Sequence, residues 1–315
     1  MEKTTIKRSD WLRRLGPLLA LLVLVIVVTS LNPNFVKLAN ILNLLRQVSV
    51  NALIAFGMTF VIITGGIDLS VGSILALASA LAAGMMAMGL PAVLVIGLAI
   101  LIGALLGAIN GLIITKGHVV PFIATLSTMA IYRGLTLVYT NGNPITGFDG
   151  GMAFQFLGRG YLLGIPMPVV MTAIVFILLY LLLHKMTFGR KAFAIGGNEK
   201  AAFISGIHIT KVKLAIYAIS GAASAIAGLI LTSRLNSAQP TAGVAFELDA
   251  IAAVVIGGTS MSGGKGRLFG TLVGALIIGT LNNGLNLLGV SSFYQQIVQG
   301  IVILIAVLLD RKEKS

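Results

Sequence analysis

Residues 91–115 read PAVLVIGLAILIGALLGAINGLIIT and contain no charged side chain. About 20 consecutive apolar residues suffice for an α-helix to cross the hydrocarbon core of a bilayer. The rest of the chain has the same character, because 57 % of its 315 residues are hydrophobic and only 10 % are charged. Soluble domains carry roughly 25 % charged residues. The composition therefore predicts an all-α integral membrane protein.

Ten apolar runs follow one another along the chain. They lie at 14–31, 45–64, 69–88, 91–115, 119–138, 167–184, 212–231, 248–262, 268–288 and 292–309. The run at 248–262 is the shortest. The first run lacks a small-residue cleavage site after it, which predicts an uncleaved anchor rather than a signal peptide. We expect about ten transmembrane helices in one membrane domain at 14–310, with short tails at 1–13 and 311–315.

The distribution of basic residues predicts the orientation, because cytoplasmic loops of membrane proteins collect Lys and Arg. With the N-terminus in the cytoplasm, most of the 22 basic residues fall in cytoplasmic segments, namely 1–14, 116, 185–213, 265–267 and 311–314. Both tails are therefore expected to be cytoplasmic. This segregation accounts for the net charge of +13 without a nucleic-acid partner.

Two pairs of segments resemble each other weakly. Val61–Gly72 is similar to Val254–Gly266, and Gly103–Ile113 is similar to Gly274–Leu285. Internal repeats of this kind are common in transporters. The alternative is chance similarity between segments rich in Gly, Ala and Leu.

The basic loop at 185–213 contains one short predicted helix. Asn198 is a suitable N-cap, Glu199 places negative charge in the first turn, and Gly206 can end the helix. So short a helix is not stable alone in water, so it must pack on something. The surface that it offers consists of Ala201, Ala202, Phe203 and Lys200. It either packs on its own protein or docks on a partner.

Three acidic residues lie within or beside apolar runs. A charged side chain at the centre of a bilayer costs at least about 2.5–3.5 kcal/mol, so each needs a reason. Asp68 follows Gly65 and Gly66, which can break the helix, so Asp68 either caps the next helix or joins Ser70 in a pathway or gate. Glu247 and Asp249 precede the eighth run, where they either cap its helix or form an outer gate that meets the substrate.

Four asparagines and one arginine also lie in apolar runs. Asn110, Asn282, Asn283 and Asn286 either hydrogen-bond neighbouring helices or line a path for a hydroxyl-rich substrate. Arg133 either snorkels to the outer surface or pairs with a carboxylate, and its position near the outer end of its run favours snorkelling.

Six segments together resemble one family. They are LNPNF (31–35), SVNALIAFGMTFVIITGGIDLSVGS (49–73), PFIATLSTMAIYRGLTLVYTNGNP (121–144), FGRKAFAIGGNEKAAFISGI (188–207), RLNSAQPTAGVAFELDAIAAVVIGGTSMSGGKGR (234–267) and LNNGLNLLGVSSFYQQIV (281–298). Over residues 31–310 the chain resembles the permease subunits of bacterial ATP-binding-cassette (ABC) importers for monosaccharides, which have a type II-like fold. Among the monosaccharides, the resemblance favours ribose.

The resemblance implies a multi-pass protein of the bacterial inner membrane that forms a channel but is no enzyme. It implies a coupling helix at Asn198–Gly206 that docks on a separate ATPase, which carries the ATP and Mg²⁺. Its other implied partners are a sugar-binding protein outside the cell and a second permease copy. The chain itself is expected to bind no cofactor or metal and to have no catalytic residue.

Two other functions stay open from the residues themselves. An ion-coupled secondary sugar transporter or a channel would need no ATPase, but charged relays inside the membrane are usual in the former, and Asp68 is the only good candidate. An intramembrane enzyme is disfavoured, because His118, His184 and His208 lack metal-ligand spacing.

Overall fold

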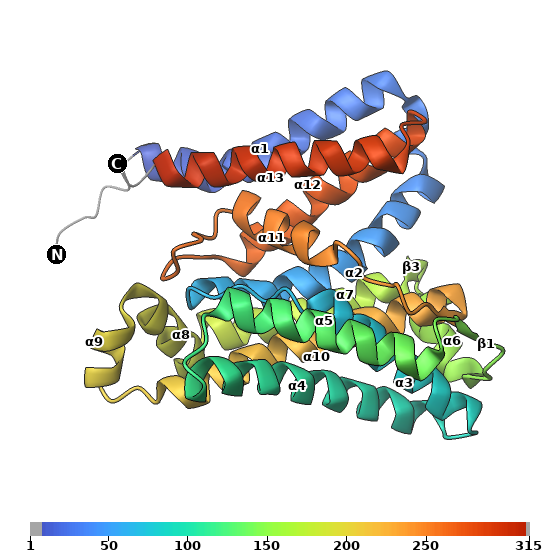
Figure 1. Cartoon of the computed structure of the whole chain (residues 1–315). Helices are drawn as coiled ribbons and strands as arrows, with labels where there is room; N and C mark the ends of the chain where they lie inside the picture. Colours follow the sequence, from blue (N-terminus) through green and yellow to red (C-terminus); the bar gives the residue numbers. More distant parts are fainter. Residues whose placement is uncertain (1–7, 313–315) are drawn as a thin grey trace.

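The computed structural model describes residues 8–312, and these are almost entirely helical (Figure 1). The helices are α1 (Arg8–Leu31), η1 (Pro33–Val36), α2 (Leu38–Ile63), α3 (Val71–Ala87), α4 (Ala92–Lys116), α5 (Pro121–Thr140), α6 (Gly151–Arg159), α7 (Met167–His184), α8 (Thr187–Gly197), α9 (Glu199–Ile204), α10 (Ile209–Leu235), α11 (Phe246–Ile256), α12 (Leu268–Leu287) and α13 (Ser292–Lys312). Two short antiparallel pairs join β1 (Ile145–Thr146) to β4 (Ser237–Ala238), and β2 (Tyr161–Leu162) to β3 (Ile165–Pro166).

Every predicted apolar run contains a helix, which confirms the mostly helical fold. Within the described part of the chain, six helices are long and apolar enough to cross a membrane: α2, α4, α5, α7, α10 and α12. The predicted tails at 1–13 and 311–315 are only partly described, since residues 1–7 and 313–315 lie outside the described residues. The described parts of both tails belong to α1 and α13.

Two of the predicted spans are broken helices. At about 1.5 Å per residue, the 11 residues of α11 reach only about 16 Å, half of the roughly 30 Å hydrocarbon core. The prediction of a full span at 248–262 is therefore wrong. Residues 236–245, which contain the short strand β4, lead into α11 and replace its missing half. Residues 64–70 lead into α3 in the same way, and α3 has 17 residues.

Two groups of helices share one plan but run in opposite directions. Each has a long helix, a break, a short helix and a long helix: α2, 64–70, α3 and α4 in one, and α10, 236–245, α11 and α12 in the other. The pairings match, since α4 and α3 pack on α10 while α12 and α11 pack on α2. This architecture is an inverted repeat, a common plan among transporters.

The two weak sequence similarities do not coincide with this repeat, which agrees with the alternative of chance similarity. Val61–Gly72 and Val254–Gly266 both follow a helix that ends on the same side, and they touch where Gly264 N donates to Ile63 O at 2.9 Å. The other similar pair, in α4 and α12, lies on helices that run in opposite directions (Figure 1). No single rotation relates both pairs of segments.

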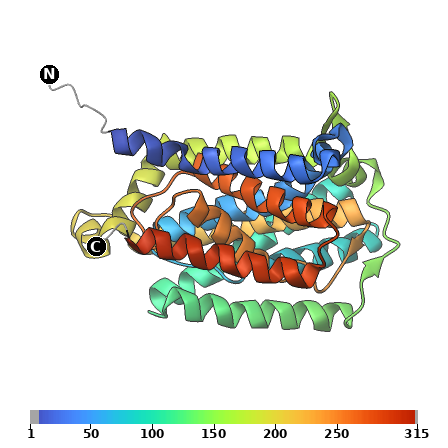
Figure 2. The same ribbon diagram turned by 90° about the horizontal axis from the view of Figure 1, so that it is seen from above.

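Helices α2 and α10 form the buried centre of the bundle, with the other long helices around them (Figure 2). They approach closely because glycine faces the crossing point: a Cβ added at Gly57 would lie 2.8 Å from Ser220 Cα. Gly103, Gly107 and Gly111 form a similar stripe on α4, one turn apart, against α10. Close approach gives van der Waals contact and lets short polar side chains reach the next helix.

Candidate functional site

A buried polar network surrounds Asp68 in the first break. Asp68 is fully buried, and its Oδ1 accepts from the Ser70 backbone N (3.1 Å) and from Ser70 Oγ (2.6 Å). Its Oδ2 accepts from Ser220 Oγ of α10 at 2.9 Å. Asn110 Nδ2 of α4 donates to Ser70 Oγ at 2.8 Å. Three predicted site residues are thus brought together, and Ser220 joins them.

The contacts of Asp68 are structural, and its role in a pathway or gate stays a prediction. The carboxylate accepts a backbone hydrogen bond just before α3, as a capping residue does. It also ties the break to α10, which lies far away in sequence. Three donors point at the carboxylate, and Asn110 supports one of them, Ser70 Oγ, so the local dipoles favour a negative group there. Asn110 Oδ1 has no partner within the described part of the chain.

A second polar group lies at the start of α11. Asp249 is buried, and its Oδ2 accepts from Asn51 Nδ2 of α2 at 3.1 Å. A Cβ added at Gly72 would lie 3.0 Å from Glu247 Oε2 and would overlap the Gly243 carbonyl. Glu247 therefore lies beside the start of α3, where the two broken helices meet. Each break thus has one carboxylate tied to the central helix of the other group.

Arg133 contacts the irregular backbone that precedes α11. Arg133 Nη1 donates to the carbonyl oxygens of Pro240 (2.6 Å) and Ala242 (2.8 Å). These carbonyls belong to the irregular segment 236–245, whose backbone groups lack helical partners. A guanidinium supplies several donors in a fixed geometry, so it can satisfy both oxygens. Arg133 therefore stabilises the second break.

The α12 asparagines lie apart from these groups. Asn283 and Asn40 exchange two amide hydrogen bonds, of 2.9 and 3.1 Å, near the α1–α2 connection. Asn282 Oδ1 accepts from Gln299 of α13 at 3.0 Å. Asn286 is exposed. Asn282 and Asn283 thus make the helix-to-helix contacts that were one of their two predicted roles.

The short helix in the basic loop is confirmed as α9. The Asn198 side chain accepts from Ala201 N at 3.0 Å, and Gly206 follows the helix with φ +81°. The predicted apolar surface needs a correction, because Ala202 faces inward and is only 4 % exposed. Phe203 and Ile204, at 71 % and 84 % exposed, form the outward apolar surface instead. Successive side chains of a helix point in different directions, so Ala202 faces inward while Phe203 and Ile204 face outward.

Helices α8 and α9 pack on the core through several contacts, of which two concern the first break. Gly196 packs so closely that an added Cβ would overlap the Ile63 carbonyl and approach Gly264. In the other contact, Lys213 Nζ of α10 donates to Glu199 Oε2 at 2.7 Å. Both contacts lie at the end of the molecule where α2 gives way to the first break.

Several residues of these groups were not singled out from the sequence: Asn51, Ser220 and Lys213. Asn51 is the one amide in an otherwise apolar part of α2, and that exception was the available signal. Ser220 gave none, since serine is common in apolar helices. Among residues 8–312, no group of three or more His, Asp or Glu is placed to hold a metal ion.

Comparison with known proteins identifies the family. Residues 40–307 match the profile of the family described as "branched-chain amino acid transport system / permease component". The ribose import permease protein of Bacillus subtilis is 67 % identical, covering 100 % of this chain and 98 % of that protein. The ribose import permease protein of Escherichia coli K12 is 53 % identical (96 % and 95 % covered), and the D-allose transport system permease protein of that strain 44 % (94 % and 91 %).

No solved structure matches the chain. The profile covers most of the chain, and the relatives are similar over nearly their full lengths. Their names are those of transport permeases, not of enzymes. The broken helices, the inverted repeat and the buried polar groups at the breaks are typical of transporters. The chain therefore belongs to the family described as branched-chain amino acid transport system permease components.

Proposed function

We propose that this chain is the membrane subunit of an ATP-driven ribose importer in the bacterial inner membrane. The observation that carries the proposal is the 67 % identity with a ribose import permease over the whole chain. ATP and Mg²⁺ belong to a separate ATPase, and a sugar-binding protein delivers ribose from outside. This chain forms the path along which ribose crosses the membrane.

The proposed topology has ten membrane-embedded helices, two of them broken, and both tails in the cytoplasm. The described ends of α1 and α13 lie at the same end of the molecule as α8 and α9 (Figure 1). That end also carries the basic loop 185–213, as the positive-inside rule requires of the cytoplasmic face.

The ATPase docks on α9 in this proposal. Lys200, Phe203 and Ile204 are exposed there, and two large apolar side chains in water suit a partner's pocket. Asn198, Glu199, Ala201, Ala202 and Gly206 form and support the helix. Motion of α9 passes to α10 through Glu199 and Lys213, and α10 carries Ser220, which holds Asp68.

The opposite end offers a basic surface to the sugar-binding protein. Arg46 stacks on Tyr161 with its guanidinium 4.9 Å from the ring centre. Arg159 Nε donates to the Arg234 carbonyl at 3.2 Å, and Arg234 lies within electrostatic range of Arg46. None of these arginines pairs with a carboxylate among residues 8–312. An acidic surface on the binding protein would complement them.

Ribose passes beside the two breaks, between this chain and a second copy of it. Ribose is neutral, so it needs hydrogen-bond partners rather than a counter-ion. Glu247 at the start of α11 is partly exposed and can meet the sugar there, whereas Asp249, Asp68, Ser70 and Asn110 are buried within this chain and hold the two breaks in place. Transporters commonly place substrates at such breaks.

Reconstitution in liposomes tests the proposal. Uptake of labelled ribose should require internal ATP, the ATPase and the binding protein together. Phe203→Ala should abolish uptake while leaving membrane insertion intact. Leu178→Ala is the matched control, because Leu178 is 61 % exposed on α7, away from α9 and from the arginine surface at the opposite end. Uptake by the permease alone, driven by an ion gradient, would instead establish the secondary transporter.

A further inference from the structure

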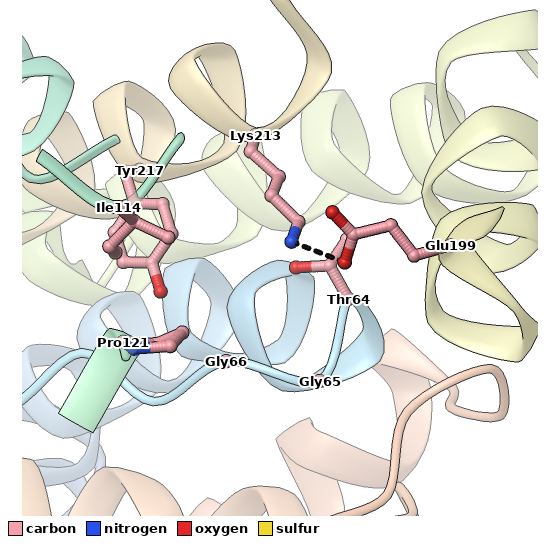
Figure 3. A pocket seen from close by; sticks show the side chains of 8 residues that line it. All are labelled: Thr64, Gly65, Gly66, Ile114, Pro121, Glu199, Lys213 and Tyr217. Atoms are coloured by element: carbon pink, nitrogen blue, oxygen red, sulfur yellow. Dashed lines mark hydrogen bonds and ion pairs between the residues drawn. The ribbon is translucent and has the colours of Figure 1, made fainter. Parts of the chain in front are cut away.

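A small pocket lies at the joint between α9 and the core (Figure 3). It has a volume of ≈ 160 Å³ and is lined by Thr64, Gly65, Gly66, Ile114, Pro121, Glu199, Lys213 and Tyr217. Pockets for drug-sized ligands are larger, roughly 300–1,000 Å³. This one suits a molecule of monosaccharide size. The pocket is open on one side and is lined by segments of one chain, so it differs from a passage between two copies.

The Tyr217 hydroxyl is the unusual group in this pocket. Tyr217 is 1 % exposed, and its hydroxyl has no hydrogen-bond partner within residues 8–312. In Figure 3 the hydroxyl points toward the space beside Pro121 and Gly66. A Cβ at Gly66 would lie 2.5 Å from this oxygen, so only glycine at position 66 leaves room for the buried hydroxyl at the pocket wall. A buried hydroxyl without a partner costs free energy, which a bound ligand would recover.

The other polar groups indicate the ligand's chemistry. Lys213 Nζ and Glu199 Oε2 are 2.7 Å apart, so their charges are already matched. A charged ligand would have to break this pair, whereas a neutral one with several hydroxyls could accept from Lys213 and donate to Glu199. The geometry points to a cytoplasmic-side site for a neutral polyol of monosaccharide size, and ribose released by the transporter is that kind of molecule.

This inference rests on the proposed function and adds a regulatory site to it. A ligand here would join Glu199 of α9 to Tyr217 of α10 and to the backbone of the first break. It would favour the present arrangement of α9 and α10 over any other. Tyr217 lies one turn before Ser220, so the restraint acts directly beside the Asp68 network. Ribose that accumulates inside would therefore slow its own import.

The test uses the complete complex in liposomes that contain ATP, with binding protein and labelled ribose outside. Vesicles are preloaded with increasing unlabelled ribose, or with sucrose at equal osmolarity. Each variant's initial uptake is expressed relative to its own rate without preloading. Ribose should slow the wild type and sucrose should not. Loss of one hydrogen bond in Tyr217→Phe should raise the half-inhibitory ribose concentration roughly 2- to 10-fold.

Tyr180→Phe is the matched control. Tyr180 lies on α7, where its ring contacts Phe176 and His184, and it does not line the pocket. It should respond to internal ribose like the wild type. If the wild type takes up no ribose, the proposed function fails. If uptake proceeds but internal ribose does not slow it, or slows Tyr217→Phe as strongly as the wild type, the site is overturned.

Discussion

The crossing of α2 and α10 predicts a large effect from one methyl group. In Gly57→Ala, the new Cβ would lie 2.8 Å from Ser220 Cα. Carbon atoms prefer about 3.5–4.0 Å, so the two helices must part by about 0.7 Å. A shift of that size would lengthen the Ser220–Asp68 hydrogen bond from 2.9 Å to about 3.6 Å, which is no longer a hydrogen bond.

The expected cost has two parts. Overpacking a tight interior costs typically ~1–3 kcal/mol, and a hydrogen bond between membrane helices averages about 0.6 kcal/mol. The free energy of unfolding should therefore fall by roughly 1.5–3.5 kcal/mol, and ribose uptake should fall with it because the Asp68 network is disturbed.

Equilibrium unfolding of the purified protein in mixed detergent micelles measures the first effect, and uptake by the reconstituted complex measures the second. Gly97→Ala is the control, because Gly97 lies in α4 with no atom within 4 Å of an added Cβ. It should leave both quantities near wild type. A Gly57→Ala protein with unchanged stability and full uptake would refute the assigned close contact.

Three further predictions concern other contacts. In the Asn40–Asn283 pair, a double-mutant cycle with leucine should give a coupling energy of about 0.6–1.7 kcal/mol by the same unfolding assay, and additive effects would contradict the exchanged amides. Arg133→Gln should loosen segment 236–245, because the carbonyls of Pro240 and Ala242 lose their donor. The chain has no Cys, so a single cysteine at exposed Thr241 can report this, and it should react faster with an external thiol reagent in the variant. An equal reaction rate would argue against the two carbonyl contacts. Gly206→Ala should lower the free energy of unfolding by about 1–2 kcal/mol, because Gly206 has a left-handed φ of +81°, and it should weaken ATPase binding. Gly197→Ala is the control, since Gly197 has no positive φ and open space around an added Cβ. Equal ATPase binding by both variants would exclude a role for the end of α9.

The sequence was sufficient for everything that depends on local composition. Apolar runs located the helices, since the bilayer penalises unpaired backbone and charge at every position along a run. The cap at Asn198 and the end at Gly206 located α9, because capping involves neighbours within one turn. Gly65 and Gly66 signalled the break before α3, whereas the break before Asp249 was not predicted.

Only the tertiary structure decided which of these residues meet. Asp68 and Ser220 are 152 residues apart, and Asn51 and Asp249 are 198 apart, so no local pattern could pair them. The same limit explains why α11 was predicted too long and why the partners of Arg133, Pro240 and Ala242, were not predicted. The sequence of an apolar helix does not distinguish residues that face lipid from residues that face another helix. Only the packing of the helices determines which face each side chain occupies.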